Sequence, residues 1–388
     1  MRRGRVAWGA AAVVFAVALG VGVGWAFRDA DPPQLWLEVP DGPYAAGDPF
    51  EVYVSADVPV RFTLRYGEVV VDEVAAELRA SLLAVAGRRV VQVDAEAASG
   101  LTATVAREVV ALRPPTVAFE APAALEVGDA FAVWVDVAAT DPWGADVVSM
   151  SLTLDGAALR LHTATDGRWA LASVPLEAPP GPRRLELRLV DSLGGVQVHE
   201  RALMVRANPR PVELLRLSAS TLAVVTPEGR ELEAAALDAA FAAVPTMPRW
   251  SEPFLLPLEG RDTSGFGAPR QYGVGGNVSY HQGADLAAPT GTPILATNHG
   301  VVRVAGFYPI KGGLVVLDHG QGVTSLYFHQ SAIDVSVGDV VVRGDVIGRV
   351  GSTGLSTGPH LHWEMRVDGV PSDPLRWVGA RYPLAARP

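Results

Sequence analysis

The segment GPHLHWEMRV at residues 358–367 decides how the C-terminal part of this chain folds. Gly and Pro at its start are typical of a strand boundary, and the alternation that follows predicts a β-strand. Residues two apart on a strand share a face, so His360 and His362 point to one side while Leu361 and Trp363 point to the other. The segment therefore predicts two imidazoles on one face of a sheet whose other face is apolar.

Histidines are concentrated in the same third of the chain, since six of the eight lie between His281 and His362. His281 stands four residues before Asp285, which places an imidazole and a carboxylate close together. The chain has no cysteine, so a metal must be held by His, Asp or Glu. A catalytic zinc takes three such ligands and keeps one position open. That set is supplied by His281, Asp285 and one residue of the pair His360 and His362.

Two other histidines in this region receive a simpler interpretation. His299 precedes Gly300 and His319 precedes Gly320, and such positions are typical of turns. Both are therefore predicted to be exposed turn residues outside the site.

Four motifs in the last third of the chain resemble, in order and spacing, the lysostaphin-type (LytM-like) zinc endopeptidases. They are Ser264-Gly-Phe-Gly267, His281-x-x-x-Asp285-Leu-Ala-Ala-Pro289, Tyr327-Phe-His329 and the run from Gly351 to His360-Leu-His362-Trp-Glu364. The resemblance covers about residues 251–378. It implies a compact antiparallel β-domain with a narrow groove, and a substrate in the peptide part of bacterial peptidoglycan.

The resemblance also implies roles for five polar residues of these motifs. It assigns one zinc ion per peptidase domain to His281, Asp285 and His362, and it leaves His329 and His360 beside the metal as catalytic residues. Zinc would lower the pKa of its water toward about 7 and polarise the scissile carbonyl, while the free histidines take up the proton and stabilise the oxyanion. We therefore expect a zinc metalloendopeptidase. The alternative is a non-catalytic LytM-like regulator or scaffold that activates another cell-wall hydrolase, although all five positions are filled here.

The region before this domain contains an internal repeat. Residues 32–40 are similar to 114–122, and residues 47–54 are similar to 128–135. Alternating apolar residues between Gly, Pro and Asp turns predict two tandem immunoglobulin-like β-sandwiches, at 34–113 and 114–207. We expect them to act as a spacer. Binding to a wall polymer, or to a cell-division or wall-synthesis protein, is the alternative role.

Residues 208–249 differ in character and are predicted to form a linker with one short amphipathic helix, followed by the peptidase domain at 250–388. Thr226 and Pro227 are typical of a helix N-cap and first turn. Apolar residues then recur at helical spacing, at Leu232, Leu237, Phe241 and Val244. This stripe predicts that the helix packs on a neighbouring element. The alternative is that the helix is a regulatory flap that covers the site.

The N-terminus carries three arginines followed by an uncharged run from Val6 to Phe27. About 20 apolar residues cross a bilayer as a helix, so residues 1–28 are predicted to be a transmembrane anchor, with a cleaved signal peptide as the alternative. The arginines place the following domains outside the cytoplasm, on a single-pass protein of the cell membrane. A net charge of −10 argues against a nucleic-acid partner. The expected fold is thus mainly β behind one N-terminal helix.

Overall fold

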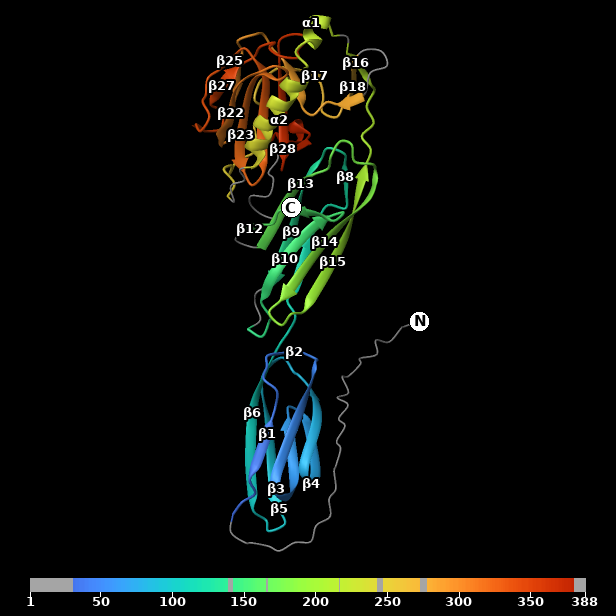
Figure 1. Ribbon diagram of the computed structural model, residues 1–388, viewed down its shortest axis with the longest axis vertical. Helices are drawn as coiled ribbons and strands as arrows, with labels where there is room; N and C mark the ends of the chain where they lie inside the picture. The colour runs from blue at the N-terminus through green and yellow to red at the C-terminus, as the bar shows by residue number, and fades with distance from the viewer. Residues whose placement is uncertain are drawn as a thin grey trace. The chain divides into compact units, whose positions relative to one another are not determined.

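The structure is a computed structural model that describes residues 31–138, 142–164, 167–215, 217–242, 247–272 and 278–379 (Figure 1). The chain divides into two compact units. The first comprises Met1–Val117, Val137–Met150 and Arg188–Gln197, and the second comprises Ala118–Asp136, Ser151–Leu187 and Val198–Pro388. Strands dominate both units, which confirms the mainly β prediction. The predicted division into five domains stays a prediction.

The first β-region is one continuous sheet of six strands. These are β1 (Leu35–Glu38), β2 (Tyr44–Ala45), β3 (Pro49–Tyr66), β4 (Val69–Leu83), β5 (Gly87–Ala97) and β6 (Thr102–Leu112). The strand order is β1-β3-β5-β6-β2, with β4 also paired to β3. Phe50, Val52 and Val54 are buried while their neighbours are more exposed, as the alternation predicts. The immunoglobulin-like assignment is not supported here, because the long strand β3 pairs with β1, β4 and β5 and joins all six strands into one sheet.

The second β-region has two sheets. Its strands are β7 (Thr116–Glu120), β8 (Ala124–Glu126), β9 (Ala130–Ala138), β10 (Val147–Leu154), β11 (Ala157–Leu159), β12 (His162–Ala164), β13 (Gly167–Ser173), β14 (Gly181–Asp191) and β15 (Val196–Arg206). One sheet has the order β11-β10-β14-β15-β8 and the other β12-β13-β9-β7. Leu185, Leu187 and Leu189 are fully buried, so their alternation is confirmed. Binding of a division or wall-synthesis protein to these β-regions stays a prediction.

Within the second unit, this β-region packs directly on the C-terminal domain. Trp134 and Trp169 belong to the same hydrophobic cluster as Trp363 of that domain. Polar contacts accompany this packing, because Arg376 forms ion pairs with Asp129 at 2.5 Å and with Glu126 at 2.8 Å. A shared core of this kind fixes the two parts more firmly than a flexible linker would.

The C-terminal domain is built on an eight-stranded sheet with the order β17-β20-β28-β24-β23-β22-β26, with β29 paired to β28. Its strands are β17 (Arg261–Ser264), β20 (Ala284–Ala287), β22 (Gly300–Tyr308), β23 (Gly312–Gly320), β24 (Val323–Gln330), β26 (Val340–Val341), β28 (His360–Val367) and β29 (Val370–Ser372). Two three-stranded sheets flank it. They contain β16 (Glu213–Leu215), β18 (Pro269–Tyr272) and β19 (Val278–Tyr280), and β21 (Pro293–Leu295), β25 (Ala332–Ile333) and β27 (Val346–Arg349). A 3-10 helix, η1 (Pro374–Trp377), follows β29.

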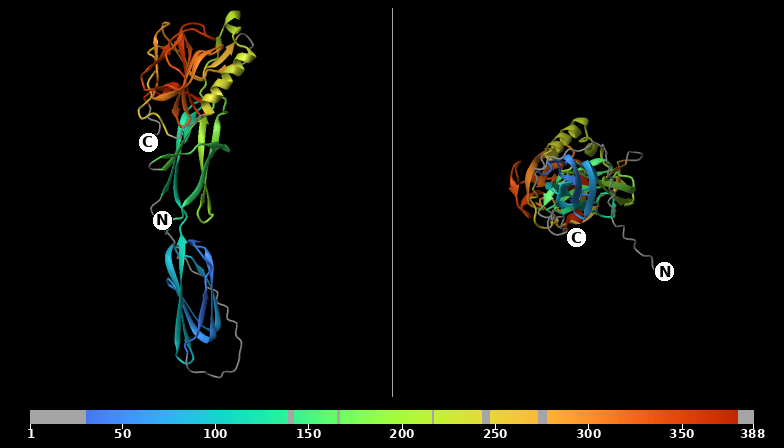
Figure 2. Two further views of the ribbon diagram at one scale, coloured as in Figure 1. Left: turned by 60° about the vertical axis from the view of Figure 1, so that its left-hand side comes forward. Right: turned by 90° about the horizontal axis from the view of Figure 1, so that it is seen from below.

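The predicted linker helix forms as α2 (Pro227–Ala242), after a short helix α1 (Ala219–Leu222). The Thr226 hydroxyl accepts the N–H of Gly229 at 3.0 Å, which confirms the predicted N-cap. The helix packs on the eight-stranded sheet of the C-terminal domain near β22 (Figure 2).

The apolar stripe predicted along this helix is only partly correct. Leu237 and Phe241 pack on the sheet, but Leu232 is 56% exposed because the buried face is centred on Glu233 and Leu237. Position 232 lies about 100° around the helix from Glu233. Val244 lies outside the described residues.

The predicted transmembrane helix at 1–28 is not supported. This segment lies outside the described residues, and no helix in the described part is long and apolar enough to cross a membrane. The longer described helix, α2, has 16 residues and includes several acidic side chains, whereas a membrane span needs roughly 20 mostly apolar ones. The predicted fold class is corrected on this point, and the membrane as a partner is not supported.

Candidate metal centre

Three neighbouring strands of the large sheet, β20, β28 and β24, carry four of the five predicted site residues. Asp285 of β20 lies directly opposite His362 of β28 in the antiparallel register. His360 lies on the same face of β28, two residues before His362, and His329 lies near the end of β24. His281 precedes β20. The sheet register thus brings together residues far apart in sequence.

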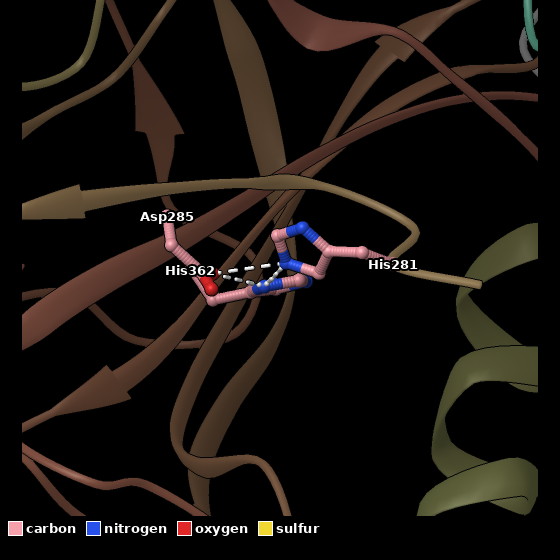
Figure 3. Close-up of side chains that lie close together, drawn as sticks. All are labelled: His281, Asp285 and His362. Atoms are coloured by element: carbon pink, nitrogen blue, oxygen red, sulfur yellow. Dashed lines mark hydrogen bonds and ion pairs between the residues drawn. The ribbon is translucent and has the colours of Figure 1, made fainter. Parts of the chain in front are cut away.

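One atom each of His281, Asp285 and His362 converges on a single point (Figure 3). His281 Nε2 lies 3.0 Å from Asp285 Oδ1 and 2.9 Å from His362 Nδ1. His362 Nδ1 lies 2.8 Å from the same carboxylate oxygen. All three side chains are buried. The structure therefore selects His362, not His360, from the pair that the strand pattern left open.

The hydrogen bonds behind the two imidazoles decide which nitrogens face this point. His281 Nδ1 is 3.0 Å from the Gly265 carbonyl oxygen, which can only accept, so Nδ1 carries the proton. His362 Nε2 is 3.0 Å from Glu364 Oε1, which assigns its proton in the same way. The inward nitrogens are then lone pairs that meet a carboxylate oxygen with no proton between them. Such a donor set fits a divalent cation such as zinc.

The charge distribution around the centre is consistent with this assignment. Although burial raises the pKa of Asp285, the adjacent imidazoles of His281 and His362 lower it far below the ordinary value, so the carboxylate is ionised. Burial lowers the pKa of His281. Burial also acts to lower the pKa of His362, but the Asp285 and Glu364 carboxylates outweigh it and raise the value.

His329 and His360 lie beside the centre without joining the converging set. Their ring centroids are 4.8 Å apart. His329 Nδ1 donates to the Thr353 carbonyl at 2.8 Å, and His360 Nδ1 donates to the Gly358 carbonyl at 2.8 Å. In the neutral form of each ring, Nε2 is therefore the nitrogen that carries no proton. Burial, with smaller effects of His360 and His362, lowers the pKa of His329 to about 3, so this ring is neutral at physiological pH.

His329 has a backbone φ of 63°, in the left-handed region that few residues other than glycine adopt. Such a conformation persists only where the surroundings hold it in place. The backbone N–H of His329 donates to the Lys311 carbonyl at 2.9 Å, and its ring donates to Thr353. The position of this histidine thus depends on two neighbouring loops.

Two residues that orient the ligands escaped the sequence prediction as site residues. Glu364 lies two residues after His362, on the same face of the strand. This spacing could have indicated that its carboxylate lies beside the His362 ring. Arg270 of β18 donates to Asp285 Oδ2 at 2.5 Å, and it also contacts Glu213 at 3.4 Å. No local pattern indicated Arg270, because its contact with Asp285 arises only when the β18–β19 hairpin folds over β20.

Replacing Arg270 by methionine is expected to weaken zinc binding by about 10- to 100-fold, the usual cost of losing a residue that orients a metal ligand. Arg270 holds the outer carboxylate oxygen, so that Oδ1 faces the histidines. Competition against a chelator would measure the affinity, and Arg261→Met, at an exposed arginine on β17, serves as the matched control. Equal affinities of the two variants would contradict this role.

The prediction for the remaining two histidines is wrong for His319. This residue is fully buried, with Nδ1 2.7 Å from the His299 carbonyl and Nε2 2.8 Å from the Ser325 hydroxyl. Burial lowers its pKa to about 4. His299 is half-buried, and neither residue belongs to the converging set. A glycine after a histidine indicates a turn but not which way the imidazole points.

Comparison with known proteins finds a family and relatives for the part of the chain that carries the site. Residues 279–374 match the sequence profile of Peptidase family M23. The DD-carboxypeptidase/endopeptidase Mpg of Neisseria meningitidis is 48% identical over 95 residues, which cover 24% of this chain and 22% of the relative. The peptidoglycan DD-endopeptidase ShyA of Vibrio cholerae is 37% identical over 150 residues, or 39% of this chain and 32% of the relative.

Among solved structures, the catalytic domain of the antimicrobial peptidase lysostaphin from Staphylococcus simulans is 32% identical. The match covers 31% of this chain and 93% of that domain, with a TM-score of 0.29. This chain spans about a third or less of the length of the two curated relatives.

Proposed function

We propose that this chain, whose residues 279–374 form a Peptidase family M23 domain, is a zinc metalloendopeptidase that hydrolyses peptide bonds in bacterial peptidoglycan. The observation that carries the proposal is the convergence of two imidazole lone pairs and one carboxylate oxygen beside two further histidines. The Vibrio relative, which is named a peptidoglycan DD-endopeptidase, supports the substrate class.

His281, Asp285 and His362 would hold the zinc ion. When bound, zinc supplies a Lewis acid for the scissile carbonyl and lowers the pKa of a water molecule. The remaining chemistry belongs to His329 and His360, whose free Nε2 atoms can each accept a proton from the attacking water. A ring that has accepted the proton can then donate a hydrogen bond to the developing oxyanion or pass the proton to the leaving amine.

Hydrolysis of peptidoglycan places the proposed activity outside the cytoplasm, where this polymer lies. Nothing in the described residues favours the non-catalytic alternative, because every residue of the ligand set and both flanking histidines are present in one place. The scaffold function is therefore an outcome for the experiment to test.

The experiment combines metal analysis with digestion of purified sacculi. We expect one zinc per chain and the release of soluble muropeptides, which mass spectrometry would identify and so define the cleaved bond. Zinc-loaded protein that releases no product, yet accelerates digestion by an added wall hydrolase, would replace the proposed enzyme with the regulator.

A further inference from the structure

A buried carboxylate connects helix α2 with the active-site loops. Glu233 is only 2% exposed, although it lies on a helix whose other acidic residues are at the surface. Burying a charge is costly unless it is paired and hydrogen-bonded. Glu233 also precedes the region that matches the peptidase family, at residues 279–374. Its contacts therefore need an explanation specific to this chain.

Glu233 binds the loop between β22 and β23. Its Oε1 accepts the backbone N–H of Ile310 at 2.6 Å and that of Lys311 at 2.9 Å. Its Oε2 lies 3.2 Å from the ammonium of Lys311, the single lysine of the chain. Three donors thus satisfy this carboxylate, and two of them are backbone groups whose position it fixes.

The same loop holds the surroundings of both flanking histidines. The Lys311 carbonyl accepts the N–H of His329 at 2.9 Å, and the Ile310 carbonyl accepts the N–H of Leu355 at 2.7 Å. Leu355 lies in the loop that leads to His360. The two loops approach so closely that a Cβ at Gly354 would lie 2.3 Å from the Ile310 oxygen. Movement of residues 310–311 would therefore disturb both loops.

A second route from the loop runs through side chains. The Lys311 ammonium lies 5.3 Å from the centroid of the Phe328 ring, within cation–π range. Phe328 in turn stacks on the ligand His362, with ring centroids 4.8 Å apart. The Glu233–Lys311 ion pair keeps the ammonium over this ring.

We propose that Glu233 is a positioning residue for His329, and that helix α2 is consequently a working part of the peptidase and not only a linker. The carboxylate holds the Ile310–Lys311 backbone, and the Lys311 carbonyl holds His329 in its left-handed conformation. This proposal rests on the proposed peptidase activity for its kinetic consequence. Its structural consequence, the orientation of the His329 ring, can be measured without that activity.

The test compares zinc-loaded Glu233→Ala with Glu231→Ala, a matched control at an exposed glutamate on the same helix. A misplacement of about 1 Å in a catalytic group can cost about 100-fold, so we expect Glu233→Ala to digest sacculi about 10- to 100-fold more slowly than the control. Glu233→Asp shortens the reach of the carboxylate and should also be slow. Glu233→Gln keeps an oxygen for the two N–H groups and should retain more activity.

A second measurement separates positioning from general stability. Long-range proton–nitrogen NMR of the histidine rings should show the Nδ1–H form of His329 in the wild type, and a shifted or averaged signal in Glu233→Ala and Glu233→Asp, with zinc content unchanged. If Glu233→Ala does not fold, Glu233→Asp decides the matter. Folded, zinc-loaded variants with control-like rates and an unchanged His329 signal would overturn the proposal. A wild type that digests nothing would instead reject the peptidase function, and the ring signal would still test the positioning.

Discussion

Replacing Asp285 by alanine is expected to abolish both zinc binding and peptidoglycan hydrolysis. Its Oδ1 lies within 3.0 Å of both inward-facing imidazole nitrogens, and no spare His, Asp or Glu joins the converging set among the described residues. Removal of the carboxylate also takes away the nearer of the two carboxylates that Arg270 pairs with, and leaves Glu213 as its partner. The variants His281→Ala and His362→Ala should also lose both zinc binding and hydrolysis, because each leaves only two of the three ligands.

Metal analysis of the purified variants checks this result, together with circular dichroism to show that the β-fold is retained. His199→Ala, at a histidine in β15 far from these residues in sequence, is the control and should keep full zinc occupancy. Full occupancy in Asp285→Ala would refute the ligand assignment.

Replacing His329 or His360 by alanine is expected to keep zinc but to reduce turnover by about 100-fold or more for each variant. In the neutral form of both rings the Nε2 atom carries no proton, and neither ring contributes a ligand atom to the converging set. Because the pKa of His329 is lowered to about 3, that ring stays a proton acceptor above this pH. Its protonation should therefore produce no loss of activity near neutral pH.

The measurement pairs zinc content with the initial rate of sacculus digestion for each variant. Loss of zinc in His360→Ala but not in His362→Ala would show that the two roles are reversed. A normal rate in His329→Ala would remove this residue from the proton-transfer step.

Local sequence patterns determined the elements on which the site is built. The alternation in 358–367 and the Thr226–Pro227 start of a helix depend on residues within one strand or one turn, and the structure contains both elements. The order and spacing of the motifs likewise indicated the peptidase family and all five site residues. Such signals can be read from sequence because they reflect the geometry of short chain segments.

The tertiary structure decided which groups meet. Asp285 and His362 are 77 residues apart, and their contact follows from the register of β20 against β28, which no local pattern specifies. The contacts of Arg270 with Asp285 and of Glu233 with the Ile310–Lys311 loop arise in the same way. Local composition was also misleading for Leu232 and His319, because burial depends on what packs against a residue and not on the residue alone. The sequence by itself therefore identified the chemical groups, and the pairing of distant strands and loops selected their partners and orientation.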